Sequence, residues 1–136
     1  MEHLAKSYGS TAKMLELSMA AGNRPQVKPG SFSQAFKRLV VVDLGFLPGG
    51  LQAPFPVLPQ GEAGPVALQR TLANLTRMDK AIAAAEEHWG GKAPIAMHMI
   101  LGPMSAAQWR KFHYVHGHHH LRQLRRRVRR VDQSVA

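Results

Sequence analysis

Residues 105–124 read SAAQWRKFHYVHGHHHLRQL, and their pattern predicts one long helix. Ser105 and Gln108 form a capping-box pattern, in which the two side chains satisfy free backbone N–H groups at the start of a helix. Bulky residues then recur on one narrow side of that helix: Trp109, Phe112, His116, His120 and Leu124. We expect the helix to run to about Val131 and to turn this side toward the core.

Five of the eight histidines fall in this stretch. His116 and His120 are four residues apart, so they project from one face and can reach a single metal ion. His113 and His119 lie at the edges of that face, where each could serve as a flanking polar group, and His118 lies well away from it. Burying two imidazoles costs free energy unless each is hydrogen-bonded or bound to a metal. A pair at this spacing also arises by chance in a histidine-rich stretch, so both interpretations stay open.

A catalytic divalent site usually needs a third protein ligand and an open coordination position. His3 is the best candidate, because it lies among small residues on the expected inward side of the first helix, and His98 is the reserve. Each of these histidines also has an ordinary explanation that involves no metal. A histidine near a chain end is more often exposed, and His88 and His98, in or near loops, are expected to be solvated or hydrogen-bonded to backbone.

Helical spacing also recurs earlier in the chain. A first helix is expected over 2–21, with Gly22 and Asn23 ending it. Its inward stripe is predicted to be His3, Ser7, Ser10, Met14, Leu17 and Ala21, with Leu4, Thr11 and Leu15 beside it. A second, shorter helix is expected from Ser31 or Ser33 to Leu44, although the β-branched Val40–Val42 could also form a strand.

A third helix is expected over 66–87, opened by Pro65. Its core-facing residues are predicted to be Leu68, Leu72, Leu75 and Ile82. Prolines and glycines crowd residues 47–65 and punctuate 89–103, so both are expected to be loops. The sequence therefore predicts a single all-α domain over 1–136, in which three or four helices pack as one bundle.

The amino-acid composition limits the kinds of metal site and covalent chemistry that the chain can have. The chain has no cysteine, which excludes disulfides and thiolate sites and leaves His, Asp and Glu as the strong metal ligands. Its apolar runs, Leu39–Val42 among them, are too short to cross a bilayer, and its first residues do not resemble a secretory leader. We therefore expect a cytoplasmic protein without membrane contact.

The net charge is +10, with a sequence pI of about 11.0. Its main source is a basic helix end at 122–130, which holds Arg122, Arg125, Arg126, Arg127, Arg129 and Arg130. Cations are favoured at the carboxyl end of a helix, and no aromatic residues interleave there to stack bases. A solvated helix end is thus favoured over a nucleic-acid site, and nucleic acid stays a less favoured partner.

Two segments resemble a known family. They are HMILGPMSAAQW at 98–109 and HYVHGHHHLRQL at 113–124, the second containing a His-x-x-His-His-Leu-Arg-Gln string. Together they look like the closing signature of DinB/YfiT-like proteins, in particular a branch known only as a domain of unknown function. The opening MEHLAKS at 1–7 is similar to the His-Leu-Ala-x-Ser helix of that branch.

The resemblance implies a four-helix bundle holding one divalent metal, expected to be zinc, nickel or manganese. Carried over by position, its ligands are His3, His116 and His120. The wider superfamily includes thiol transferases and isomerases, often homodimers, although a shared fold does not transmit a reaction. Relatives carry a complete helix before the His-Leu-Ala segment. Here that helix is missing, so we expect either a late start or a bundle closed by a second copy.

Two functions follow from these patterns. In the first, the protein is a metal-dependent enzyme of hydrolase or thiol-transferase type acting on a small substrate, with Glu2 or His119 as a base. Its catalytic residues stay unassigned. In the second, it is a non-catalytic helical bundle that binds a partner or a polyanion through its arginine-rich end.

Overall fold

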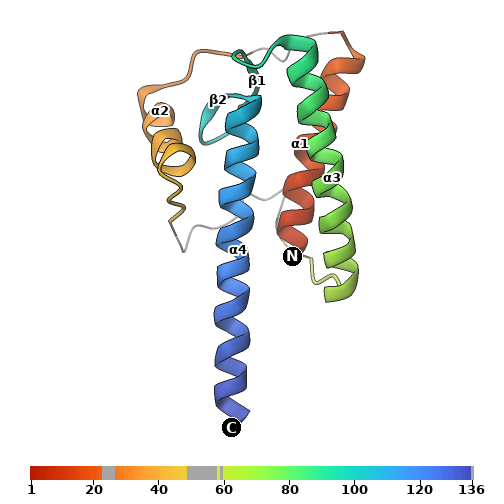
Figure 1. Cartoon of the computed structure of the whole chain (residues 1–136), viewed down its shortest axis with the longest axis vertical. Coiled ribbons are helices and arrows are strands. Elements are labelled where there is room, and N and C mark those ends of the chain that lie inside the picture. The colour runs from red at the N-terminus through yellow and green to blue at the C-terminus, as the bar shows by residue number, and fades with distance from the viewer. Residues whose placement is uncertain (23–26, 49–57, 59, 136) are drawn as a thin grey trace.

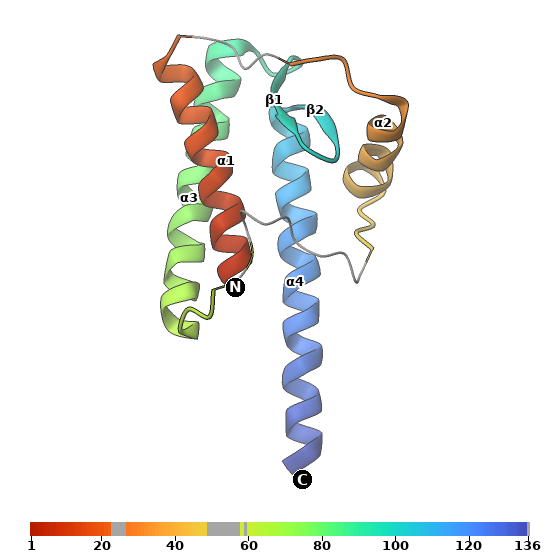
Figure 2. The same cartoon turned by 180° about the vertical axis from the view of Figure 1, so that it is seen from behind.

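Figure 1 shows the fold in a computed structural model, which describes residues 1–22, 27–48, 58 and 60–135. Its elements are α1 (Glu2–Ala20), α2 (Phe32–Arg38), the π-helix η1 (Leu39–Asp43), α3 (Gly64–Trp89), β1 (Pro94–His98), β2 (Gly102–Ser105) and α4 (Ala106–Val135). Helices α1 and α3 lie side by side on one side of α4, and α2 lies on the other (Figures 1 and 2). The described part is thus mainly helical, as the sequence predicted.

The expected helices are present, with changes at their ends. The first helix ends before Gly22, whose φ of 65° is the left-handed conformation that glycine adopts without strain. Pro65 stands in the first turn of α3. The second helix is short, and its last turn is the π-helix η1 rather than a strand. The expected loop at 47–65 falls largely outside the described residues.

The buried face of α1 differs from the predicted stripe. The buried residues are Glu2, Leu4, Ala5, Tyr8, Thr11, Ala12 and Leu15, whereas Ser10 and Leu17 are exposed. On α3 the prediction is confirmed for Ile82, which is fully buried, but wrong for Leu68, Leu72 and Leu75, which are 40–56% exposed. Its buried face combines small residues, among them Ala67, Ala81 and Ala85, with the larger Met78 and Ile82. Alanines on both helices allow their axes to approach closely, which helical periodicity alone does not reveal.

The segment 89–103 is more ordered than the expected loop. Strands β1 and β2 pair antiparallel, with Ala96 opposite Met104 and His98 opposite Gly102. Ile95, Ala96 and Met104 are fully buried, so the hairpin adds to the core. The Arg38 guanidinium donates hydrogen bonds to the carbonyl of Pro103 at 2.7 Å and of Leu101 at 3.2 Å, which ties α2 to the hairpin.

The long helix begins as predicted. The Gln108 side chain accepts a hydrogen bond from the Ser105 N–H at 3.0 Å, and the Ser105 hydroxyl accepts one from the Gln108 N–H at 3.4 Å. Trp109, Phe112 and His116 face the core, whereas Leu124 is 44% exposed because α4 extends past the other helices (Figure 1). Among the described residues, no helix is long and apolar enough to cross a membrane.

Candidate metal centre

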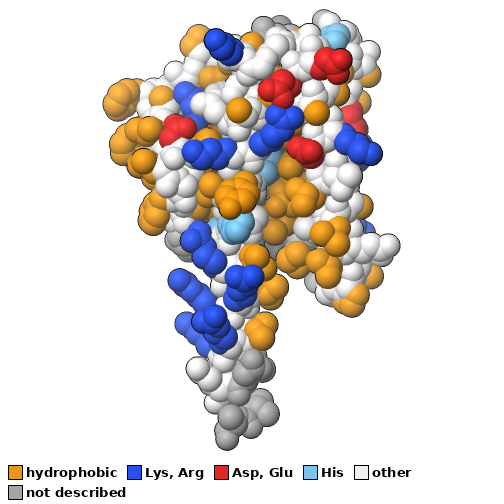
Figure 3. All heavy atoms as spheres, viewed as in Figure 1, with side chains coloured by type: hydrophobic (Ala, Val, Ile, Leu, Met, Phe, Trp, Pro, Cys, Tyr) orange, Lys and Arg blue, Asp and Glu red, His pale blue; other side chains and the backbone are white. Residues whose placement is uncertain are grey.

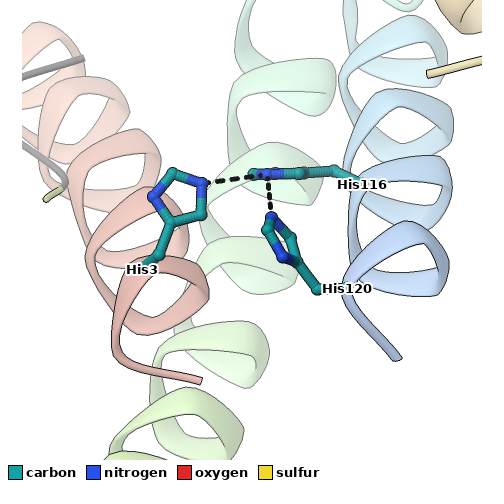
Figure 4. A group of neighbouring side chains, drawn as sticks. All are labelled: His3, His116 and His120. Carbon is teal, nitrogen blue, oxygen red and sulfur yellow. Dashed lines mark hydrogen bonds between the residues drawn. The ribbon is translucent and has the colours of Figure 1, made fainter. Parts of the chain in front are cut away.

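Three histidines from the two ends of the chain meet where the start of α1 packs against α4 (Figure 4). The Nε2 atom of His116 lies 3.1 Å from Nε2 of His3 and 3.1 Å from Nε2 of His120. One possible ligand atom from each of the three lies within 4.8 Å of the others. Two nitrogens that each lie about 2.1 Å from one tetrahedral ion are about 3.4 Å apart. The spacing of the ring nitrogens therefore fits a single ion.

The two helices position the candidate ligands in different ways. His116 and His120 stand one turn apart on α4, so the helix itself aligns their rings. The ring of His116 also stacks on that of Phe112, with centroids 5.4 Å apart and an interplanar angle of 25°. His3 comes from the first turn of α1, and only packing of α1 against α4 can bring it to the pair.

The start of α1 is pinned by several hydrogen bonds. The Glu2 carboxylate accepts hydrogen bonds from the backbone N–H groups of Gln60, Gly61 and Glu62 at 2.7–3.1 Å. Its Oε1 also lies 3.1 Å from the Lys6 ammonium. The Thr71 hydroxyl donates to the carbonyl of Ala67 at 2.7 Å and also lies 3.3 Å from the carbonyl of Met1. These contacts oppose fraying of the first turn and so hold His3 in place.

The same contacts bear on the role of Glu2. The N–H groups of the 60–62 segment and the nearby Lys6 ammonium lower the pKa of Glu2 to about 2, which outweighs the opposing effect of burial. A carboxylate with that pKa is ionised but is a weak base near neutral pH. Glu2 is therefore better suited to holding α1 in place than to accepting a proton from a substrate.

The ligand rings on α4 are electrically neutral at physiological pH. Burial, with smaller contributions from neighbouring histidines, lowers the pKa of His116 to about 3 and that of His120 to about 4. Neutral imidazole is the form that binds a metal. A proton therefore does not compete with an ion for these nitrogens near pH 7.

Hydrogen bonding alone satisfies the three nitrogens less well than an ion does. A neutral imidazole nitrogen either donates or accepts, so His116 Nε2 cannot make a full hydrogen bond to both neighbours. One ion accepts a lone pair from all three rings at once. Among the described residues no carboxylate belongs to this group, so the candidate ligand set is three imidazoles. Such a set suits zinc, nickel, copper and iron better than magnesium, calcium or manganese.

The remaining histidines lie outside the three-histidine group. His98, the reserve ligand, accepts hydrogen bonds at Nδ1 from the N–H groups of Ile100 and Leu101 at 3.1 and 3.2 Å. Hydrogen bonding to backbone is the role expected for His98, although His98 ends strand β1 and does not lie in a loop. His118 is exposed and packs on Tyr114, with ring centroids 4.3 Å apart.

The two edge histidines also have other partners. His119 Nε2 lies 2.8 Å from Nε2 of the Gln123 side chain, and His113 is buried with Nε2 3.1 Å from the Thr11 hydroxyl. Tyr8, which the sequence did not single out, packs edge-on against the His113 ring at a centroid distance of 5.3 Å. The spacing of Leu4, Tyr8, Thr11 and Leu15 on α1 is the signal that could have identified it.

Comparison with known proteins identifies the family. A family model described as "Protein of unknown function (DUF1569)" matches residues 15–127, which is more than half of the chain. The chain therefore belongs to this family. The matched region includes His116 and His120, and His3 lies before it. No curated protein and no solved structure matches the chain.

Proposed function

We propose that this member of the DUF1569 family binds one divalent metal ion through His3, His116 and His120 and uses it in a reaction on a small substrate. The observation that carries the proposal is the convergence of three ring nitrogens from two helices, with the Nε2 atoms of His3 and His120 each 3.1 Å from that of His116. Three protein ligands leave a coordination position open for water or substrate, as catalytic sites require.

Zinc or nickel is the proposed metal, and manganese, also expected from the sequence, is less favoured by imidazole ligands. A divalent ion lowers the pKa of a water or thiol bound to it and so supplies a nucleophile near neutral pH. The proposed reaction is therefore of hydrolase or thiol-transferase type. The arginines of the nearby α4 end would steer an anionic substrate toward the site.

Kinship with DinB/YfiT-like proteins and a cytoplasmic location are parts of the same proposal. The order of the three ligands along the chain and the helical arrangement support the kinship. Neither observation identifies a reaction, because one fold can carry many chemistries. Cell fractionation tests the location.

Metal content of the purified, untagged protein is the first test, measured beside the double variant His116→Ala/His120→Ala. We expect about one divalent ion per chain in the wild type and loss of it in the variant, because two of three ligands are gone. His118→Ala is the matched control, since it removes an exposed histidine of the same helix. A metal-free wild type that takes up neither zinc nor nickel after dialysis would overturn the proposal.

The arginine-rich end of α4 supports a second candidate function. All six arginines between 122 and 130 are exposed, and α4 carries them beyond the other helices (Figure 3). No ion pair is found for them among the described residues. In this alternative the protein binds a polyanion or an acidic partner there without catalysis.

Binding to a fluorescent DNA duplex and to heparin separates the two candidates. If the second is right, affinity falls steeply with salt, and Arg125→Gln, Arg126→Gln and Arg129→Gln together abolish binding. The variant His116→Ala/His120→Ala should then bind as the wild type does. Binding that is weak and insensitive to the arginine changes would exclude this function.

A homodimer is the last part of the proposal. Arg110 of α4 pairs with Asp79 and Glu86 of α3, so these residues mark the facing sides of the two helices. Farther along the same sides lie exposed apolar residues: Leu68, Leu72 and Leu75 on α3, and Tyr114, Leu121, Leu124 and Val128 on α4. Figure 3 shows hydrophobic side chains on both sides of the recess between α3 and α4.

An exposed apolar surface of this kind is typical of protein interfaces. A two-fold axis would cover it with the same surface of a second copy. With the two α4 helices antiparallel, the arginine-rich end of one copy would approach the acidic residues of α3 in the other. This complementarity of charge favours a second copy over an unrelated partner.

A further inference from the structure

A glycine stands in the middle of α4 beside the first of its two ligand histidines. Glycine in a helix interior is destabilising relative to alanine, so its presence needs a reason. A Cβ atom built on Gly117 would lie 2.8 Å from the hydroxyl oxygen of Tyr8. Real Cβ atoms essentially never come so close to another heavy atom. Gly117 therefore allows Tyr8 of α1 to touch the backbone of α4.

The tyrosine has little room to move away. Tyr8 is 4% exposed, and its ring packs against that of His113, which is 3% exposed. His113 is in turn fixed by the Thr11 hydroxyl. A methyl group at position 117 would therefore have to push α1 and α4 apart, because neither the ring nor its neighbours can swing into solvent.

This contact joins the same two helices as the three-histidine group. Gly117 directly follows His116 and precedes His120 by three residues, while Tyr8 follows His3 by five residues on α1. A metal site tolerates errors of only about 0.2 Å in its ligand distances. A shift of a few tenths of an ångström between the helices would therefore disturb the site while leaving the core largely packed.

We infer that the Tyr8–Gly117 contact sets the spacing of α1 and α4 and so positions His3 against His116 and His120. Tyr8 and Gly117 are thus positioning residues and not ligands. The inference rests on the proposed metal site for its purpose, although the contact itself does not depend on an ion. It assigns a role to a buried tyrosine and to a helix-interior glycine that packing alone leaves unexplained.

The test is a cycle of Gly117→Ala, Tyr8→Phe and the double variant, with Co²⁺ as the probe. Affinity is measured by competition with a chelator, and the visible absorption spectrum reports the geometry around the ion. We expect Gly117→Ala to lose about 10-fold or more in affinity and to change the spectrum, as disturbed support of metal ligands does. Tyr8→Phe removes the clashing oxygen, so the double variant should recover most of the affinity and the wild-type spectrum.

Gly64→Ala is the matched control, because a Cβ there meets nothing within 4 Å. Wild-type Co²⁺ binding by Gly117→Ala, or failure of Tyr8→Phe to restore it, would overturn the inference. Urea unfolding of the metal-free proteins keeps the two proposals apart. If the wild type binds no Co²⁺, the metal proposal and the positioning of ligands fail together. In that case the Tyr8–Gly117 contact still sets the helix spacing only if Gly117→Ala lowers the free energy of unfolding and Tyr8→Phe restores it.

Discussion

The carboxylate of Glu2 accepts a hydrogen bond from the backbone N–H of Gly61 at 3.0 Å, and so joins the first turn of α1 to the segment before α3. The N–H groups of Gln60 and Glu62 donate to the same carboxylate. Three converging N–H groups form a small anion-binding concavity of the kind that backbone often makes. Because His3 is the next residue, these hydrogen bonds also fix the backbone from which the candidate ligand His3 projects.

Glu2→Gln should weaken the hydrogen bonds between this side chain and the backbone N–H groups of 60–62. An amide keeps one acceptor oxygen but turns an NH2 group toward backbone N–H donors, so at least one of them loses its partner. We expect amide hydrogens of 60–62 to exchange faster with deuterium and metal affinity to fall by a few-fold, because His3 is held less firmly. Glu87→Gln is the control, since Glu87 is exposed on α3. Unchanged exchange at 60–62 would show that these hydrogen bonds do not form in solution.

The lowered pKa of His98 predicts that the protein loses stability in acid. Burial lowers this pKa to about 4 from an ordinary value of 6.5. Between these two values the unfolded chain takes up a proton at this residue and the folded chain does not, so the free energy of unfolding falls as pH falls. Across the full range between these two pKa values, this one group lowers the free energy of unfolding by about 3 kcal/mol. Urea unfolding at several pH values between 7.5 and 4.5 measures the slope.

His98→Asn separates this residue from the other buried histidines. The Asn oxygen can still accept from the N–H groups of the hairpin turn, but it does not titrate. Below pH 6.5 the stability of this variant should fall less steeply, by about 1.4 kcal/mol per pH unit at most. An unchanged slope would mean that His98 is not the group responsible.

Much of the fold follows from the sequence, because helix ends carry local signals. The capping box at Ser105 and Gln108, the glycine at 22 and the proline at 65 act within one turn of themselves, so their effects can be predicted from neighbours alone. The burial of α3 could not be predicted in this way. Leu68 and Leu72 are more hydrophobic than Ala81, but small residues let α1 approach, and that choice depends on the partner helix.

The hairpin was missed for a related reason. Segment 94–105 is short and contains Gly102 and Pro103, which locally indicate a loop. Its strands are stabilised by partners far away in sequence, such as Arg38. The candidate ligands His116 and His120 could be paired from spacing, since one helix carries both. His3 could be named as a third ligand from its place on the expected inward side of the first helix, and the resemblance to a family pointed to the same residue. No local rule, however, relates two residues 113 positions apart, so their distance could not be predicted.

The exposed apolar surface of α3 and α4 predicts the behaviour of two charge variants. Leu72→Glu and Leu121→Glu each place a carboxylate where a second copy would pack, and burying an unpaired charge there is costly. We expect the wild type to be dimeric at micromolar concentration and both variants to be folded monomers by sedimentation equilibrium. Ala73→Glu, at an exposed position on another side of α3, should remain dimeric. A monomeric wild type would exclude the dimer.

Comparison of His3→Ala with His98→Ala decides the third ligand. His3 Nε2 lies 3.1 Å from that of His116, whereas His98 Nδ1 already accepts two backbone N–H groups. We expect His3→Ala to weaken Co²⁺ or Zn²⁺ binding by about 100-fold or more, since the remaining helix pair offers only two nitrogens. His98→Ala should keep the wild-type affinity and lose thermal stability instead, because the hairpin turn loses its acceptor. The reverse result would move the third ligand to the hairpin and leave α1 without a part in the site.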